Sequence, residues 1–135
     1  MEQRRFGTAA RCGMTDITGD VEQYLHARAA DGIQDGFVCI YSPHTTCAVT
    51  INEGFDPDVQ RDISTFLSKL VPENSGFRHS EGNSDAHVKV SLIGASCLVP
   101  VIGGRTALGQ WQRVFLCEFD GPRTRTLYFS FIRAE

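Results

Sequence analysis

The sequence has no long apolar run and no long run of like charges. No segment approaches the roughly 18–20 consecutive apolar residues of a membrane-spanning helix, and the N-terminal residues have no apolar signal region. The chain carries 13 Lys and Arg against 16 Asp and Glu, a formal net charge of −3. A protein that binds nucleic acid normally shows a basic stripe instead. We therefore expect a cytoplasmic protein with neither a membrane nor a nucleic acid as its partner.

Closely spaced cysteine pairs are also missing. The five cysteines are odd in number and spread along the chain, so a structural zinc ribbon is not expected. Cys39, Cys97 and Cys117 lie in apolar segments, where a free cysteine behaves as a small buried hydrophobe. Cys47 differs because it follows His44 by three residues, and the sequence leaves open whether its thiol is reactive.

The chain has the length and composition of one domain, residues 1–135, with 41% hydrophobic residues and no internal repeat. Periodicity and turn residues predict an α+β order of strands and helices. Strands are expected at residues 3–14, 37–41, 46–52, 97–102, 105–119 and 124–132. Helices are expected from a cap at Thr18 or Asp20 to Gly32, and over residues 57–70 and 85–94.

Three local features support these elements. Asp56 is expected to cap the helix at 57–70, with Pro57 at its first position. Gly103-Gly104 is typical of a type I′ hairpin turn. The segment 114–119 is apolar on both faces, so both need cover from a second layer or another subunit, which indicates an oligomer whose sheets pack together.

Three of the four histidines are the candidate metal ligands. His44 follows a Ser-Pro pair at the end of an expected strand, and His79 and His87 frame a polar loop with Gly82 at its centre. Three imidazoles suit a zinc-type divalent ion better than magnesium, which prefers oxygen ligands. The alternatives are a histidine that bonds a turn, for His44, and a solvated polar loop, for the other two.

Four carboxylates are candidates for acid–base or histidine-orienting roles: Glu53, Glu81, Asp85 and Glu118. Asp56 and Asp58 are better explained as helix-start residues. Glu118 interrupts an apolar strand, and a buried carboxylate has to be paired or functional. A structural salt bridge is its alternative, with four candidate partners, Arg105, Arg113, Arg123 and Arg125.

The residues around the third helix favour an anionic ligand, either a phosphate or a carboxylate group. Asn83, Ser84 and the helix N-terminus can donate hydrogen bonds to an anion, and Lys89 is close in sequence. Trp111, next to Gln112, can stack on a planar ring, although a lone tryptophan on a strand is more often part of a core or an interface. The predicted partner is a small phosphorylated metabolite.

Three segments resemble the signatures of one family. They are Thr45-Thr46-Cys47-Ala48-Val49-Thr50-Ile51-Asn52-Glu53 with Asp56-Pro57-Asp58-Val59, then Arg78-His79-Ser80-Glu81-Gly82-Asn83-Ser84-Asp85-Ala86-His87-Val88-Lys89, and finally Gly109-Gln110-Trp111-Gln112 with Cys117-Glu118-Phe119-Asp120-Gly121-Pro122-Arg123. The chain is similar over essentially its whole length to the YjbQ family, labelled secondary thiamine-phosphate synthase. One departure is Cys47, where that family more often has alanine.

The resemblance implies a seven-stranded β-sandwich with two or three helices and a homotrimer whose sheets pack about a threefold axis. It implies a site built on the three histidines, with Glu53, Asn83, Asp85, Gln112 and Glu118 nearby. It also implies a transferase that joins a pyrimidine methyl pyrophosphate to a thiazole phosphate, as a weak or side activity. Two alternatives stay open: a metal-dependent hydrolase or lyase of a small phosphorylated metabolite, and a non-catalytic trimer that binds small molecules or metal.

Overall fold

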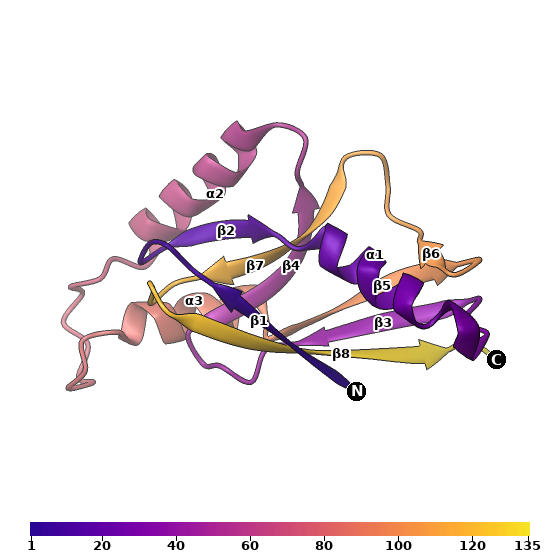
Figure 1. Ribbon diagram of the computed structural model, residues 1–135. Coiled ribbons are helices and arrows are strands. Elements are labelled where there is room, and N and C mark those ends of the chain that lie inside the picture. The colour runs from indigo at the N-terminus through magenta and orange to yellow at the C-terminus, as the bar shows by residue number, and fades with distance from the viewer.

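Two antiparallel sheets and three helices make up the chain, which the computed structural model describes from residue 1 to residue 135 (Figure 1). The larger sheet has the order β1 (Glu2–Gly7), β8 (Thr124–Arg133), β3 (Gly36–Tyr41), β5 (Ser96–Ile102) and β6 (Arg105–Thr106). The smaller sheet has the order β2 (Gly13–Asp16), β7 (Gln112–Glu118) and β4 (Cys47–Glu53). The helices are α1 (Thr18–Ala27), α2 (Pro57–Leu70) and α3 (Ser84–Ile93), with one 3₁₀ turn, η1 (Ala29–Asp31).

The local signals at α2 and at the β5–β6 turn are confirmed. The Asp56 carboxylate accepts a hydrogen bond from the Asp58 amide at 2.9 Å, and Pro57 takes the first helical position. Gly103 and Gly104 have φ values of 57° and 76°, the pair of positive angles that a type I′ turn requires. These two features depend only on neighbouring residues, which is why the sequence predicts them.

Two expected strands are wrong in their extent, and the fold has eight strands in place of the seven that the resemblance implies. Residues 3–14 form β1 in the larger sheet and β2 in the smaller one, because the chain crosses between the layers at residues 8–12. Residues 105–119 likewise divide into β6 and β7, one in each sheet. Hydrophobic pattern alone does not say which sheet a segment joins.

The expected cap of α1 is also wrong. Neither Thr18 nor Asp20 caps the helix, since Ile17 holds the cap position, and the Asp16 carboxylate accepts the Thr18 amide at 2.9 Å. The Thr18 hydroxyl instead accepts the Val114 amide of β7 at 2.9 Å. This residue therefore joins α1 to the smaller sheet. Gly32, the expected end, closes η1 with a left-handed backbone at φ 67°.

The strand β7 is buried on both faces, but both covers come from the same chain. Val114 and Leu116 belong to the main core, which fills the space between the sheets and α1. Phe115, Cys117 and Phe119 belong to a second cluster beneath α2 and α3. The oligomer inferred from this strand therefore loses its basis, because no second subunit is needed to cover it.

The outer face of the larger sheet is the apolar surface that the chain leaves open. Five side chains of β3, β5 and β8 point outward there and are 42–68% exposed: Phe37, Tyr41, Leu98, Ile102 and Ile132. In Figure 1, α2 lies above the smaller sheet and no helix lies below β8 and β3. We call this surface the open sheet face. No helix of the structure is long and apolar enough to cross a membrane.

Candidate functional site

His44 is held in one orientation by a backbone amide near the start of β8. It lies in the link between β3 and β4, and its Nε2 accepts a hydrogen bond from the Thr126 amide at 2.9 Å. An imidazole that accepts at Nε2 carries its proton at Nδ1 when it is neutral. Burial lowers the pKa of His44 below its ordinary value, and the charge of Arg125 lowers the pKa further. At neutral pH the side chain is therefore an uncharged donor through Nδ1.

His87 and His79 lie next to each other on the α3 side of the site. Their rings meet edge to face, with centroids 5.5 Å apart. His79 Nε2 is 3.7 Å from the Glu81 carboxylate, and both side chains are exposed. His87 is in the first turn of α3, so the helix fixes its backbone, whereas His79 lies in the loop before the helix.

The arrangement does not fit a three-histidine zinc site. No group of three or more His, Cys, Asp or Glu side chains is close enough to hold one ion. The Nε2 atom of His44 is occupied by an amide hydrogen, and its Nδ1 carries the remaining proton, so neither nitrogen has a free lone pair for a metal. Residues from separate elements do meet here, but they form a hydrogen-bonding site.

His44 and His87 both line a cavity of about 300 Å³, which we call the polar compartment. Nine of its ten lining residues have polar or charged side chains, and the tenth is Pro43; the nine are His44, Thr45, Thr46, Glu81, Asn83, His87, Asp120, Arg123 and Arg125. The Asn83 amide donates to Asp120 at 2.8 Å, and Arg123 donates to the same carboxylate at 3.1 Å. Asn83 Oδ1 is buried and has no hydrogen-bond partner. A buried acceptor without a partner is rare, and here it calls for a donor from a ligand or water.

Glu118 forms the buried floor below this compartment, paired with Arg125. The guanidinium bonds both carboxylate oxygens, one of them from Nε at 2.7 Å, and reaches the Thr46 hydroxyl at 2.8 Å. Burial by itself would raise the pKa of Glu118, but the bonds from Arg125 and from the Asp120 amide outweigh it, and the pKa is lowered. The carboxylate therefore stays ionised, and both of its oxygens accept hydrogen bonds, so it is not available for proton transfer. Glu118 is thus the structural salt bridge that the sequence left open as its alternative role.

Asp85 and Lys89 form a second buried ion pair, on the far side of α3 from the polar compartment. Lys89 Nζ donates to Asp85 at 2.9 Å, and Arg11 bonds both carboxylate oxygens at 2.9 and 3.1 Å. Burial opposes ionisation, yet these bonds lower the pKa of Asp85 to about 2. Asp85 thus orients no histidine, and Lys89 does not line the compartment. Ser84 begins the helix and is absent from the lining too.

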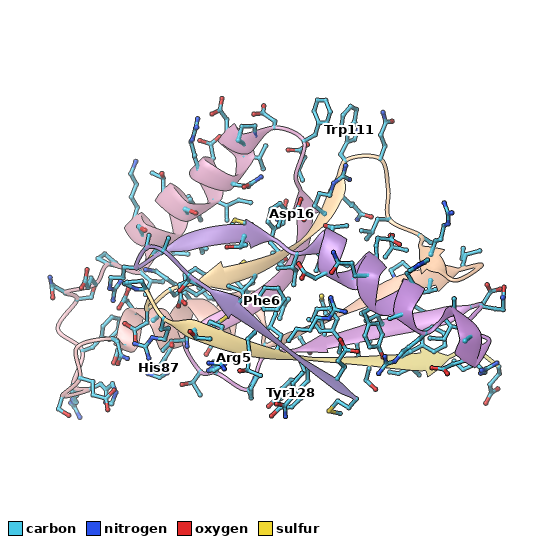
Figure 2. All side chains as sticks on the ribbon, in the orientation of Figure 1. Arg5, Phe6, Asp16, His87, Trp111 and Tyr128 are labelled. Atoms are coloured by element: carbon cyan, nitrogen blue, oxygen red, sulfur yellow. The ribbon has the colours of Figure 1, made fainter.

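The remaining predicted residues lie at the opposite end of the smaller sheet (Figure 2). Glu53 pairs with Gln112 at one end of the β4–β7 ladder, and Cys47 pairs with Glu118 at the other. Because β4 is seven residues long, the two ends are roughly 20 Å apart at about 3.3 Å per residue. Figure 2 shows Trp111 accordingly at the top of the molecule and His87 at its lower left.

Each residue of this distant group has a local structural partner. The Glu53 carboxylate accepts the amides of Phe55 and Asp56 at 3.0 Å, which closes the turn into α2. The side-chain oxygen of Gln112, Oε1, accepts a hydrogen bond from the Gly109 amide at 2.8 Å. Trp111 packs edge to face on Phe55 with centroids 4.9 Å apart. In a single chain, these residues do not contribute to the histidine site.

Cys47 is not a reactive thiol in this structure. Its side chain is fully buried in the main core, and burial raises its pKa to about 11. A thiol needs its anion to act as a nucleophile. The nearness to His44 in sequence therefore reflects the strand that follows, in which Cys47 points inward.

Asp120, Arg123 and Thr45 are the site residues that the sequence reasoning missed. Asp120 and Arg123 stand in the turn between β7 and β8, where Asp-Gly-Pro reads only as a turn signal. Thr45 adjoins His44 in the link between β3 and β4. The position of Glu118 is the signal that could have identified them. A carboxylate that interrupts an apolar strand at its end marks that end as a polar site, and Asp120 and Arg123 lie in the turn that follows.

The largest hollow of the molecule lies elsewhere and holds no comparable chemistry. Its volume is about 570 Å³, between α1 and the β5–β6 turn, with Leu25 and Ile33 among its walls. Its charged or titratable groups are Glu22, His26 and Arg105. Glu22 is bonded to Thr106, which leaves two separate groups and no cluster. The smaller polar compartment is the better candidate site.

The chain is similar to known proteins over nearly its whole length. A sequence model described as UPF0047 protein YjbQ-like matches residues 2–134. UPF0047 protein YugU of Bacillus subtilis is 48% identical over 124 residues, 91% of this chain and 92% of that protein. UPF0047 protein MJ1081 of Methanocaldococcus jannaschii is 47% identical over 114 residues, 84% of this chain and 83% of that protein.

A solved structure shares the whole fold. The crystal structure of a yjbq/upf0047 family protein from Clostridium acetobutylicum superposes with a TM-score of 0.92 at 39% identity. The match covers 98% of this chain and 100% of that one. The similarity therefore extends through both sheets and all three helices.

Proposed function

This chain belongs to the YjbQ-like UPF0047 family, and we propose that it is an enzyme that binds the phosphate group of a small metabolite in the polar compartment. The observation that carries the proposal is the lining of that compartment, in which every residue except Pro43 is polar or charged and which brings together histidine, arginine, threonine and asparagine side chains. Such a cavity binds a ligand through hydrogen bonds and charge.

The phosphate oxygens would be bound by donors that have capacity left. The Arg123 side chain is half exposed and has N–H groups beyond those that bond Asp120. His44 offers its Nδ1 proton, and Thr45 its hydroxyl. Arg125 adds positive charge but no free orientation, since Glu118 and Thr46 hold it. A donor group on the same metabolite would satisfy Asn83 Oδ1.

His87 is the group that we propose for proton transfer. It lines the compartment together with His44 and, unlike the His44 ring, its ring forms no hydrogen bond with the protein. A histidine close to the reacting oxygen serves as a general acid or base near neutral pH. Glu81 also lines the cavity and stands beside His79, so it is the carboxylate available for a supporting role.

The first reaction to assay is the coupling of pyrimidine methyl pyrophosphate with thiazole phosphate, proposed as a weak or side activity. Its leaving pyrophosphate and its phosphate ester both need the kind of donors found beside Arg123. The alternative is hydrolysis or elimination on one phosphorylated metabolite, which uses the same donors. We also place the protein in the cytoplasm, where such metabolites are made and consumed.

Binding of inorganic phosphate tests the proposal most directly. Arg123→Gln should weaken the affinity measured by calorimetry about tenfold, because it removes a charge-assisted donor. Arg105→Gln is the matched control. Arg105 is exposed and lines a different cavity, so the substitution removes the same charge away from the site, and the variant should bind phosphate with the affinity of the wild type. Equal affinities for both variants, or no binding by the wild type, would contradict the proposal. Binding without turnover of any substrate would favour the non-catalytic alternative.

We further propose that the protein is a homotrimer assembled through the open sheet face. Exposed apolar side chains from three adjacent strands form one continuous surface there, with Ile102 68% exposed and Leu98 53%. Monomers seldom leave a large apolar patch in water, so such a patch marks an interface. The outward ring of Tyr41 packs against Tyr128, with centroids 6.2 Å apart, at the end of β3 where this surface borders the cavity that Tyr41 and His44 both line.

A further inference from the structure

A second cavity adjoins the polar compartment and has the opposite character. Its volume is about 330 Å³, and it shares four lining residues with the polar compartment: Pro43, His44, Thr45 and His87. Its other walls are Tyr41, Val90 and Ala95, with the small hydroxyls of Ser42 and Ser91. It has no carboxylate and no guanidinium. We call it the neutral compartment.

The two histidines belong to the boundary between these compartments; the His44 ring is held by a hydrogen bond, and the backbone of His87 is held by its helix. The amide of Thr126 holds the His44 ring at 2.9 Å. His87 is part of α3, and its carbonyl accepts the Ser91 hydroxyl at 2.9 Å one turn later. A ligand that extends from one compartment to the other therefore passes the four shared residues, which include both imidazoles.

The walls of the neutral compartment suit a flat, uncharged group. Tyr41 offers a ring that is tilted against Tyr128 and is still 47% exposed. Val90 and Ala95 add aliphatic surface on the α3 side. A ring gains most by contacting such walls, and the hydroxyls at Ser42 and Ser91 are small enough to leave it room. A charged group would find no counter-charge there and would lose its hydration.

We infer that the neutral compartment binds the uncharged, ring-bearing part of the same substrate whose phosphate lies in the polar compartment. This rests on the proposed phosphate site and adds the residues that select the rest of the molecule, with Tyr41 and Ser91 foremost. His44 and His87 then lie at the junction between ring and phosphate, where the reacting bond of such a substrate is placed.

Two ligands separate the compartments experimentally: inorganic phosphate occupies the polar compartment alone, and phenyl phosphate occupies both. In the wild type, calorimetry should give roughly tenfold tighter binding for phenyl phosphate, since about 60 Å² of ring surface leaves water. Equal affinity for the two ligands would overturn the inference while leaving the phosphate site intact. No binding of either ligand would overturn both the phosphate site and the inference.

A matched pair of variants on α3 locates the effect. Ser91→Trp fills the neutral compartment, so phenyl phosphate should lose its tenfold advantage while the affinity for inorganic phosphate, which also reports correct folding, is unchanged. Leu92→Trp changes the next residue, which is 56% exposed and outside the lining, and should keep both affinities. If Leu92→Trp removes the advantage as completely as Ser91→Trp, the ring does not bind in this compartment.

Discussion

Removing the Asp85 carboxylate tests how the helix that carries His87 is fixed. The side chain is fully buried and bonded by Lys89 and Arg11, which lowers its pKa from an ordinary 3.8 to about 2. That difference corresponds to roughly 2.5 kcal/mol of folding stability at neutral pH. Because the folded pKa is the lower one, this stability is present above pH 4 and is lost as the pH falls towards 2; about half remains at pH 3.

Asp85→Asn removes the charge at every pH. Lys89 is 2% exposed and would be left in the core without a counter-charge, while Arg11 keeps Glu73 at 3.4 Å. Breaking a buried pair on one side costs about 3–5 kcal/mol, and the remaining partner of Arg11 favours the lower end, about 3 kcal/mol. Urea unfolding should show this loss at pH 7 and a clearly smaller difference from the wild type at pH 3, where the wild type has lost part of the same contribution.

The matched control is Asp58→Asn, in the exposed i, i+3 pair with Arg61 on α2. An exposed pair contributes less than about 1 kcal/mol, so this variant should unfold close to the wild type at both pH values. The reasoning is refuted if Asp85→Asn costs no more than Asp58→Asn at pH 7. It is also refuted if the cost of Asp85→Asn is the same at pH 3 as at pH 7, since the pH dependence must come from this carboxylate.

Two further predictions concern the assembly and the metal hypothesis. Ile102→Glu should convert a trimer to monomers in light scattering, because it would bury a charge in the interface formed by the open sheet face. The control Leu70→Glu, at an exposed apolar site on α2, should leave the trimer intact. A monomeric wild-type protein would contradict the trimer proposal. After incubation with zinc, elemental analysis should find the same zinc content in His44→Ala as in the wild type, because Nε2 of His44 accepts the Thr126 amide and Nδ1 carries a proton. Loss of zinc in both His44→Ala and His87→Ala would show that a metal displaces the Thr126 hydrogen bond.

Sequence reasoning succeeds here where the cause is local. Asp56 and Pro57 start α2, and the two glycines turn β5 into β6, because each needs only its neighbours. The long expected strands at 3–14 and 105–119 fail because the choice between two sheets is decided by distant partners. One missed signal was available: Asp85 and Lys89 are four residues apart on a helix, a spacing that favours an ion pair.

The site shows the same division between local and distant causes. His44, His79, His87, Glu81 and Asn83 do gather, since the segments that carry them end at one edge of the fold. Glu53, Trp111 and Gln112 lie at the other end because strand length, which the motifs do not display, separates them by roughly 20 Å.

The two halves of the site are fastened to different parts of the fold, and each half has its own support. The β3–β4 link with His44 is tied to β8 by the Thr126 amide, and Arg125 ties Thr46 to Glu118 below it. The α3 half with His87 rests on the smaller sheet through Ala86 and Val90. The position of His87 therefore depends on how closely α3 packs on that sheet, and the fully buried Ala86 allows close packing because its side chain is only a methyl group. A larger side chain at Ala86 should move α3, and with it His87, away from the β3–β4 link that carries His44.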